Sequence, residues 1–174
     1  KAVASNPDVI QGANSAQAGF QLRTARQLGF KGVFISDSPL APGIILAVAG
    51  KEASHDVLTN GMDFKHPTPG IKETMELWAK AYKDPYFEDT PVTYAQAEAF
   101  VQALKKANSV EVEKVIAAFE SMTEPGSIQT CWGPAYMSGA KTFGVNRVLN
   151  RPVPQTRLMH GKIEFIGLKM PDLQ

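Results

Sequence analysis

Short apolar runs and one amphipathic stretch alternate in the first third of the chain. Val9-Ile10 and Val33-Phe34-Ile35 are continuous apolar runs of the kind that form buried strands. Between them, apolar residues recur at helical spacing, at Ala18, Leu22, Ala25 and Leu28. Asn14 and Ser15 are suited to cap the start of this helix, and Gly29 is suited to end it. The pattern predicts a βαβ unit with two parallel, adjacent strands.

Two further segments extend this unit. Ile44 to Ala49 is apolar on every side, which predicts a buried helix that starts near Pro42. Asp56 to Phe64 predicts a third strand, interrupted by Asn60-Gly61. Open α/β sheets bind ligands at the carboxyl ends of their strands. The polar loops that follow the first two strands are therefore the place to expect a binding site.

Beyond the turn-rich stretch His66 to Gly70 the period becomes helical. We predict three helices, over 71–82, 91–108 and from Ser109, which would be the N-cap of the third. The predicted buried positions of the last two helices are Ala97, Phe100, Val101, Leu104, Val112, Val115, Ile116 and Phe119. The tail is rich in loops, and Thr156 to Leu168 predicts a hairpin that turns at His160-Gly161.

Composition limits the possible functions. The formal net charge is +1, so no nucleic-acid or acidic-membrane partner is expected, and no apolar run is long enough for membrane insertion. Cys131 is the single cysteine, which excludes an intrachain disulfide, and three scattered histidines show no metal-ligand spacing. No phosphate-binding loop or dinucleotide motif occurs, so we expect neither a metal nor a cofactor.

The order of elements indicates a part of something larger. Three parallel strands followed by three helices leave the helices without a sheet to cover. No signal peptide is visible, and the chain begins with lysine rather than methionine, as a mature or cut product would. We expect the chain to be the C-terminal portion of a longer protein.

The sequence also resembles a known family. Six segments follow one another as in the second half of a type I periplasmic solute-binding protein of the branched-chain amino acid (leucine/isoleucine/valine) class. They are PDVI, SAQAGFQLRTARQLGFKGVFISDS, AVAGKEASHDVLTNGM, HPTP, VTYAQAEAFVQALKKANS and, at the position of the family's late hairpin, MHGK. The resemblance implies an α/β fold of two Rossmann-like lobes, present here in part. It implies that residues 1–65 belong to the second lobe, 66–132 to a helical segment of the first lobe, and 133–174 to a crossover and second-lobe tail.

The resemblance also implies ligand-binding positions in the second lobe. Asp37 would bind a ligand ammonium group, as an acid does in members that bind amino acids, with Ser36 and Ser38 as hydroxyl donors. The same residue types also suit an Asx-turn or helix cap before Pro39.

Four more positions have two interpretations each. Asn14 and Ser15 lie in the equivalent loop after the first strand, where the family often has an aromatic side chain. Asparagine there favours a more polar ligand, or helix capping. Thr90 and Tyr94 open the second predicted helix, where family ligands can touch an aromatic ring, although Tyr94 would equally suit a core position. The family commonly has Asp after this tyrosine, whereas this chain has Ala95.

The resemblance implies a non-enzymatic receptor of an ABC importer. Such a receptor would be periplasmic, or lipid-anchored outside a Gram-positive cell. It would capture an amino acid or similar solute by hinge closure and present it to a membrane permease. A cytosolic amide or amino acid sensor on the same fold is an alternative. A small α/β enzyme is a third, although no nucleophile-base pair is readable.

Overall fold

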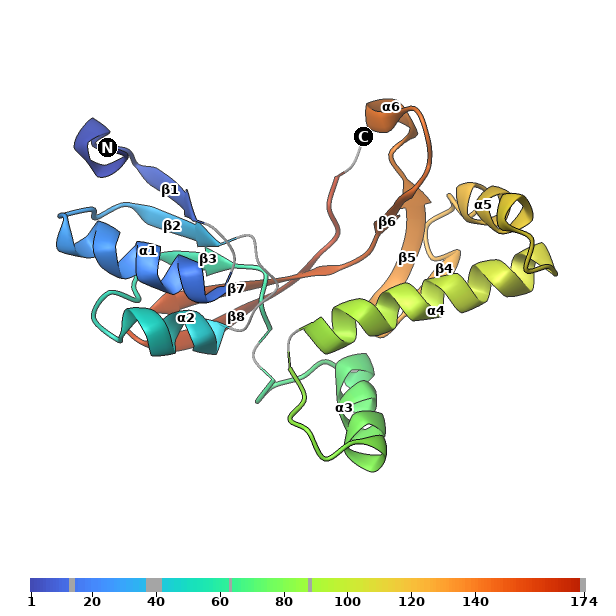
Figure 1. Ribbon diagram of the computed structural model, residues 1–174, viewed down its shortest axis with the longest axis horizontal. Coiled ribbons are helices and arrows are strands. Elements are labelled where there is room, and N and C mark those ends of the chain that lie inside the picture. The colour runs from blue at the N-terminus through green and yellow to red at the C-terminus, as the bar shows by residue number, and fades with distance from the viewer. Residues whose placement is uncertain (13–14, 37–41, 63, 88, 173–174) are drawn as a thin grey trace. The chain divides into compact units, whose positions relative to one another are not determined.

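The computed structural model describes residues 1–12, 15–36, 42–62, 64–87 and 89–172. The chain forms two compact units, whose elements Figure 1 labels. Unit 1 comprises Lys1–Pro67, Phe87–Asp89 and Pro154–Leu168, and unit 2 comprises Thr68–Tyr86, Thr90–Val153 and Lys169–Gln174. Each unit has a hydrophobic core of its own.

Unit 1 is built on a five-stranded sheet with the order β1-β2-β3-β7-β8. Its strands are β1 (Val9–Gly12), β2 (Val33–Ser36), β3 (Val57–Thr59), β7 (Val153–Met159) and β8 (Lys162–Lys169). The first three are parallel, and β7 is antiparallel to β3. The predicted βαβ unit is therefore confirmed. The third strand is shorter than predicted, because the backbone N–H of Gly61 turns back to the Thr59 hydroxyl at 3.1 Å.

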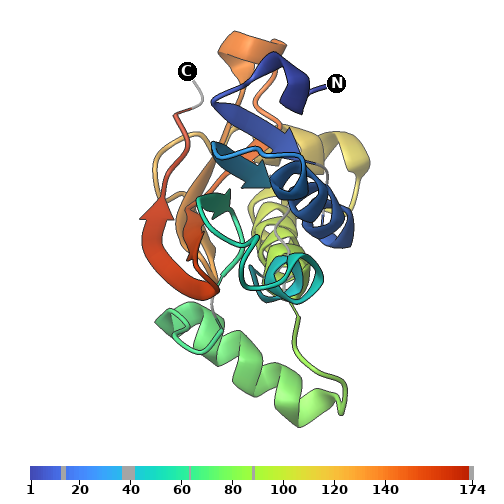
Figure 2. The same cartoon turned by 90° about the vertical axis from the view of Figure 1, so that its left-hand side faces the viewer.

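Helices α1 (Ser15–Gln27) and α2 (Pro42–Ala49) lie side by side on one face of this sheet (Figure 2), and a short 3-10 helix, η1 (Val3–Ser5), precedes β1. The core comprises Ala18, Leu22, Ala25, Phe30, Phe34, Ile45, Ala49, Val57 and Leu158. Gly29 has φ +91°, and the Phe30 N–H donates to the Ala25 carbonyl at 3.0 Å, which closes α1 in a Schellman-type turn. Leu28, the last apolar position of the predicted helical stripe, follows the last helical residue and is 66% exposed.

The β7–β8 hairpin turns where the sequence predicts. His160 and Gly161 both have positive φ, 49° and 77°, as a two-residue type I′ turn requires. The Gly161 N–H donates to the carbonyl of Ser54 at 3.1 Å, which ties this turn to the loop after α2.

Unit 2 contains the three predicted helices and a small sheet that the sequence did not predict. The helices are α3 (Pro69–Ala81), α4 (Asp89–Ala107) and α5 (Val112–Glu120), with a short α6 (Ala140–Phe143). The antiparallel sheet has the order β4-β5-β6, formed by β4 (Ile128–Thr130), β5 (Gly133–Ser138) and β6 (Val148–Asn150). Its core comprises Ala99, Ala103, Val115, Met122, Ile128, Ala135 and Met137.

The buried side of α4 differs from the prediction. Pro91, Ala95, Ala99 and Ala103 are buried, whereas Phe100 and Val101 are 50% and 45% exposed. Helix α4 is apolar on more than one side, so its period alone does not determine which side packs within this chain.

The start of α5 also differs from the prediction. The N-cap is Glu111, and the Ser109 hydroxyl instead accepts from the Glu111 N–H at 3.0 Å in the turn before the helix. Val112 lies at the first helical position and is 67% exposed rather than buried.

Candidate functional site

The carboxyl ends of the three parallel strands of unit 1 form one row. Ser36 at the end of β2 pairs in register with Gly12 at the end of β1 and with Thr59 at the end of β3. This is the edge at which open α/β sheets bind ligands. The structure therefore brings one predicted residue, Ser36, together with one that the sequence reading missed, Thr59.

The two hydroxyls of this row differ in their hydrogen bonds. Thr59 is 3% exposed and accepts from the Gly61 N–H. Ser36 is 1% exposed, and its hydroxyl has no hydrogen-bond partner among the residues that the structure describes. Most buried polar groups are paired, and an unpaired one is unfavourable, so such a group calls for an explanation. A hydroxyl at this edge can donate to, or accept from, a bound solute.

Gly12 leaves the neighbouring strand end without a side chain. A Cβ at this position would lie 2.3 Å from the ring of Phe34, whose side chain packs in the core of unit 1. A side chain at this point would force the buried Phe34 ring to move, which favours glycine, and the backbone at the end of β1 is partly exposed beside Ser36.

Three of the predicted ligand positions lie outside the described residues: Asn14, Asp37 and Ser38. Ser15 begins α1, and its side chain is likewise not described. Their predicted roles stay predictions.

A second set of polar residues lies on α4 in unit 2. Thr90, Tyr94 and Glu98 are spaced four apart and therefore share one side of the helix. The Thr90 hydroxyl is buried without a hydrogen-bond partner in the described part of the chain. Tyr94 is 38% exposed, so it is not a core residue. The predicted residues Thr90 and Tyr94 are thus neighbours, one turn apart.

Glu98 completes this side of α4 and was missed in the sequence. Its carboxylate accepts a hydrogen bond of 2.6 Å from the Cys131 N–H. Burial raises the pKa of Glu98, against the effect of that hydrogen bond. Burial also raises the pKa of Tyr94, with a further contribution from the charge of Glu98. The helical spacing from Tyr94 is the signal that could have identified Glu98.

The corner beside Glu98 is closed by packing. Cys131 and Trp132 are 7% and 4% exposed, and the Trp132 indole N–H and the Cys131 thiol both donate to the carbonyl of Pro91, at 3.2 and 3.4 Å. Burial raises the pKa of Cys131 to about 12. A thiol held in this state is a packing group rather than a nucleophile.

Neither a metal site nor a membrane-spanning helix is found among the described residues. No group of three His, Cys, Asp or Glu side chains there is placed to hold a metal ion. None of the described helices combines the length and apolar character that crossing a bilayer needs.

Comparison with known proteins identifies the family. A family model described as "Periplasmic binding protein" matches residues 1–156. A comparison with curated proteins gave no match. The chain therefore belongs to the periplasmic binding protein family, which confirms the resemblance seen in the sequence.

Solved structures show the same fold. A leucine binding protein, LivK, from Thermotoga maritima has a TM-score of 0.68 at 20% identity over 98% of this chain. The substrate-binding protein LivJ from Streptococcus pneumoniae, solved with isoleucine, has 0.66 at 11% identity over 98%. A solute-binding protein from Rhodopseudomonas palustris, solved with benzoate, has 0.60 at 15% identity over 97%.

The likeness covers only part of these proteins. The chain spans 47% of the Thermotoga protein, 48% of the Streptococcus protein and 44% of the Rhodopseudomonas protein. The fold is thus the type I periplasmic binding protein fold, over about half of its length.

Proposed function

We propose that this chain is part of an extracytoplasmic solute-binding receptor of an ABC importer, which binds an amino acid or a similar small organic solute. The observation that carries the proposal is the Ser36 hydroxyl, buried without a partner among the described residues at the carboxyl edge of the parallel strands. A bound solute would supply the missing hydrogen bond.

The neighbouring positions would complete the unit 1 part of the site. Asp37 follows Ser36 directly and would pair with a ligand ammonium group through a charge-assisted hydrogen bond. Ser38, Asn14 and Ser15 would add hydroxyl and amide contacts. Leucine binding, isoleucine and benzoate appear in the names of similar structures, which supports a small organic ligand class.

Thr90 and Tyr94 would contribute from unit 2. The unpartnered Thr90 hydroxyl and the half-exposed Tyr94 ring lie on one side of α4, where they can hydrogen-bond and stack on a solute. Ligand contacts from two units would couple binding to hinge closure, because a ligand that touches both favours the closed state by its differential affinity.

The proposed receptor also implies a division of the chain into lobes. We propose that residues 1–65 belong to the second lobe, 66–132 to the first lobe, and 133–174 to the crossover and tail. The unit boundary between Pro67 and Thr68 supports the first of these limits. Membership of a solute-binding family supports a non-enzymatic role and a permease partner.

Binding calorimetry on the whole receptor tests the proposal. L-leucine, L-isoleucine and benzoate are titrated separately, and saturable binding of at least one is the expected result. Turnover of a solute, or binding that survives loss of the polar groups at both Ser36 and Thr90, would contradict it.

A further inference from the structure

The polar row at the carboxyl edge of unit 1 continues by one residue beyond Thr59. Asn60 follows the end of β3, and Gln155 on β7 lies opposite it, because Thr59 and Thr156 are antiparallel register partners. A hydrogen bond of 3.2 Å from Gln155 Nε2 to Asn60 Oδ1 joins the two side chains. A pair of amides is therefore added to the hydroxyl groups at this edge of the sheet.

A second hydrogen bond determines which way the two amides point. Gln155 Nε2 also donates to the carbonyl of Pro154 at 3.1 Å, and a backbone carbonyl can only accept. The atom of Gln155 at this point must therefore be the nitrogen, and the atom of Asn60 that faces it must be the oxygen. Asn60 Nδ2 consequently points away from Gln155, and its two N–H groups have no partner among the described residues.

The turn after β3 does not use the side chain of Asn60. Asparagine is common in turns because it tolerates a positive φ, or because its oxygen accepts from a backbone N–H two residues on. Asn60 is not among the described residues with a positive φ, and its oxygen accepts from Gln155 instead. The Thr59 hydroxyl closes the turn, since it accepts from the Gly61 N–H. The turn therefore does not explain the amide nitrogen of Asn60.

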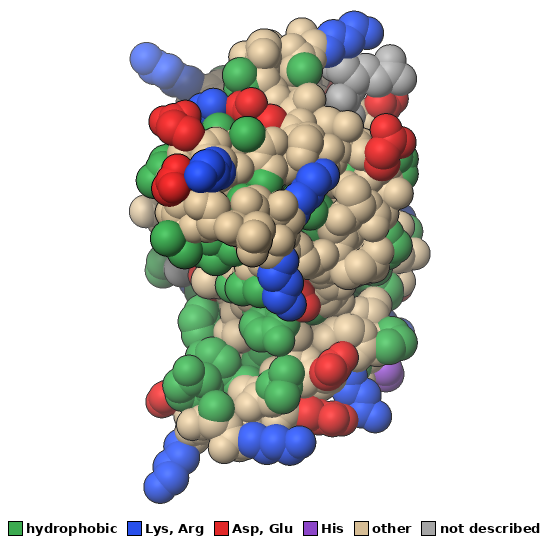
Figure 3. Space-filling view, turned by 90° about the vertical axis from the view of Figure 1, so that its right-hand side faces the viewer, with side chains coloured by type: hydrophobic (Ala, Val, Ile, Leu, Met, Phe, Trp, Pro, Cys, Tyr) green, Lys and Arg blue, Asp and Glu red, His purple; other side chains and the backbone are tan. Residues whose placement is uncertain are grey.

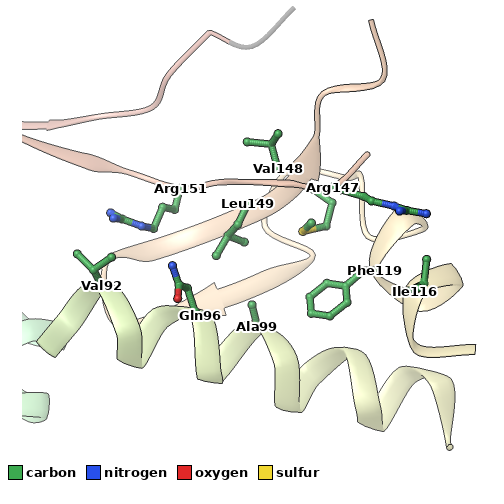
Figure 4. Close-up of a pocket in the computed structure, with 10 residues that line it drawn as sticks. Val92, Gln96, Ala99, Ile116, Phe119, Arg147, Val148, Leu149 and Arg151 are labelled. Carbon is green, nitrogen blue, oxygen red and sulfur yellow. The ribbon is translucent and has the colours of Figure 1, made fainter. Parts of the chain in front are cut away.

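An open apolar groove in unit 2 is not part of the candidate site. It lies between α4, α5 and the β5–β6 pair and has a volume of about 650 Å³, and Val92, Gln96 and Ala99 point into it from α4 (Figure 4). With 3.6 residues per turn, these three residues lie on a different side of the helix from Thr90 and Tyr94. The apolar walls of the groove therefore give no reason to expect an apolar solute at the site.

Apolar side chains also gather on the surface in the lower part of Figure 3, at the height of α3. Leu77 on α3 and Tyr82 at its C-cap contribute to them. The Tyr82 ring packs on that of Trp78, with the ring centroids 4.4 Å apart. This surface contains none of the predicted ligand residues. In unit 1, the groups at the carboxyl edge that can distinguish one solute from another are the polar ones described above.

We infer that Asn60 is a specificity-determining residue of the proposed receptor. Its amide N–H groups donate to a carbonyl or carboxylate oxygen in the side chain of the bound amino acid, and Gln155 is the positioning residue that holds the amide in this orientation. The assignment rests on the proposed function and names its class of solute, an amino acid with an oxygen-bearing side chain. An aliphatic side chain in this place would remove water from the N–H groups without replacing the hydrogen bonds, which costs affinity.

Three amino acids of nearly the same size test this assignment by calorimetry on the whole receptor. L-asparagine and L-aspartate have the shape of L-leucine, with an amide or a carboxylate in place of its two terminal methyl groups. We expect at least one of them to bind about tenfold or more tightly than L-leucine. The tighter of the two identifies the acceptor as a carbonyl or as a carboxylate.

Two negative results have different meanings. Binding of L-leucine as tightly as both polar amino acids, or more tightly, would overturn the role of Asn60 and leave the proposed receptor standing. Absence of binding for these three amino acids, L-isoleucine and benzoate would overturn the proposed function, and the role of Asn60 with it.

Asn60→Leu removes the donors at nearly constant size. Asn146→Leu is the matched control, because Asn146 Oδ1 also accepts one hydrogen bond, from the Ala140 N–H at 3.1 Å, outside the candidate site. We expect Asn60→Leu to lower the affinity for the tighter polar amino acid about tenfold without lowering that for L-leucine, and Asn146→Leu to change neither. Equal losses for both solutes in Asn60→Leu, or no loss, would overturn the assignment. The comparison of solutes in the wild type decides it even if Asn60→Leu does not fold.

A double-mutant cycle tests the positioning role of Gln155. Gln155→Leu releases the amide of Asn60, so we expect the affinity for the tighter polar amino acid to fall about threefold and that for L-leucine to stay the same. The same replacement in Asn60→Leu is expected to have no further effect, because Gln155 then has no amide to orient. Additive losses in the double variant would overturn the positioning role, since a purely structural effect of Gln155 would persist without Asn60.

Discussion

Ser36 and Thr59 are register partners at the ends of adjacent parallel strands, and both are buried, yet only Thr59 has a hydrogen-bond partner within the described chain. The carboxyl edge of the sheet thus contains a buried hydroxyl whose hydrogen bond is not made within the described chain. If Ser36 binds a solute, loss of its hydroxyl should lower the affinity for that solute without lowering the free energy of unfolding. The role of Ser36 can therefore be tested by measuring both quantities on the same variant.

The first prediction concerns stability. Ser36→Ala is expected to leave the free energy of unfolding unchanged or to raise it by up to about 1 kcal/mol, because it removes an unpaired buried hydroxyl. Ser54→Ala is the matched control: Ser54 is also fully buried in unit 1, but its hydroxyl donates to the Gly50 carbonyl at 2.8 Å. Its loss is expected to lower the free energy by about 1 kcal/mol in urea unfolding. Equal destabilisation of both variants would indicate that Ser36 has a structural partner.

The second prediction concerns two glycines that each follow a proline at the start of a helix. A Cβ on Gly70 would lie 2.3 Å from the backbone oxygen of Cys131, whereas a Cβ on Gly43 would meet none of the described atoms within 4 Å. Gly70→Ala is expected to destabilise by about 2 kcal/mol or more, and Gly43→Ala to stabilise by up to about 1 kcal/mol. Thermal unfolding measures both, and a tolerated Gly70→Ala would show that α3 does not pack on the Cys131 loop.

The third prediction concerns the ion pair between Asp56 and Arg157. The hydrogen bond from Arg157 is the main cause that lowers the pKa of Asp56. The ion pair therefore stabilises the fold above the unfolded pKa, which is about 4, and this contribution is lost as pH falls through the lower folded pKa. The pair is partly exposed, so the contribution is small, about 0.5 kcal/mol.

Asp56→Asn provides the comparison, because asparagine tolerates the positive φ of 49° at this position. Unfolding free energies of the two proteins are measured from pH 6 down to pH 2. The difference between them is expected to shrink as pH falls below about 4. If the difference in unfolding free energy stayed constant over that range, the effect of Asp56→Asn on stability would not come from the carboxylate charge.

The fourth prediction concerns the single cysteine. With its pKa raised to about 12 by burial, Cys131 is expected to react with a thiol reagent at pH 8 roughly a hundredfold or more slowly in the folded protein than in urea. Similar rates in both conditions would show that the Cys131–Trp132 corner opens in the native state.

The sequence predicted the βαβ start of the chain because its signals are local. These signals are two short apolar runs, apolar residues at helical spacing and Gly29 at the helix end, and each depends only on residues close by in the sequence. The face of α4 was predicted wrongly because alanines and aromatic residues on different sides are both apolar, and the choice depends on tertiary partners. The β4–β5–β6 sheet was missed because β4 and β6 have three residues each and β5 begins at Gly133-Pro134, residue types that are typical of a turn.

The candidate site was predictable only in part. Ser36 follows an apolar strand, which is a local signal. Thr59 becomes a candidate through strand register, which joins distant parts of the sequence. Glu98 has a local signal in its helical spacing from Tyr94, but its hydrogen bond to the Cys131 backbone is visible only in the structure. The pairing of Ser36 with Thr59 depends on the order of strands in the sheet, which no single stretch specifies.

The most direct test of the receptor assignment is a comparison of solute affinities. Calorimetry with L-leucine, L-isoleucine and benzoate first identifies the solute that the whole protein binds. The affinity for that solute is then measured for the wild type, Ser36→Ala and Ser54→Ala. We expect Ser36→Ala to lower the affinity about tenfold without lowering stability, and Ser54→Ala to leave the affinity unchanged while it lowers stability. Unchanged affinity in Ser36→Ala would contradict the placement of the solute at the carboxyl edge of the parallel strands.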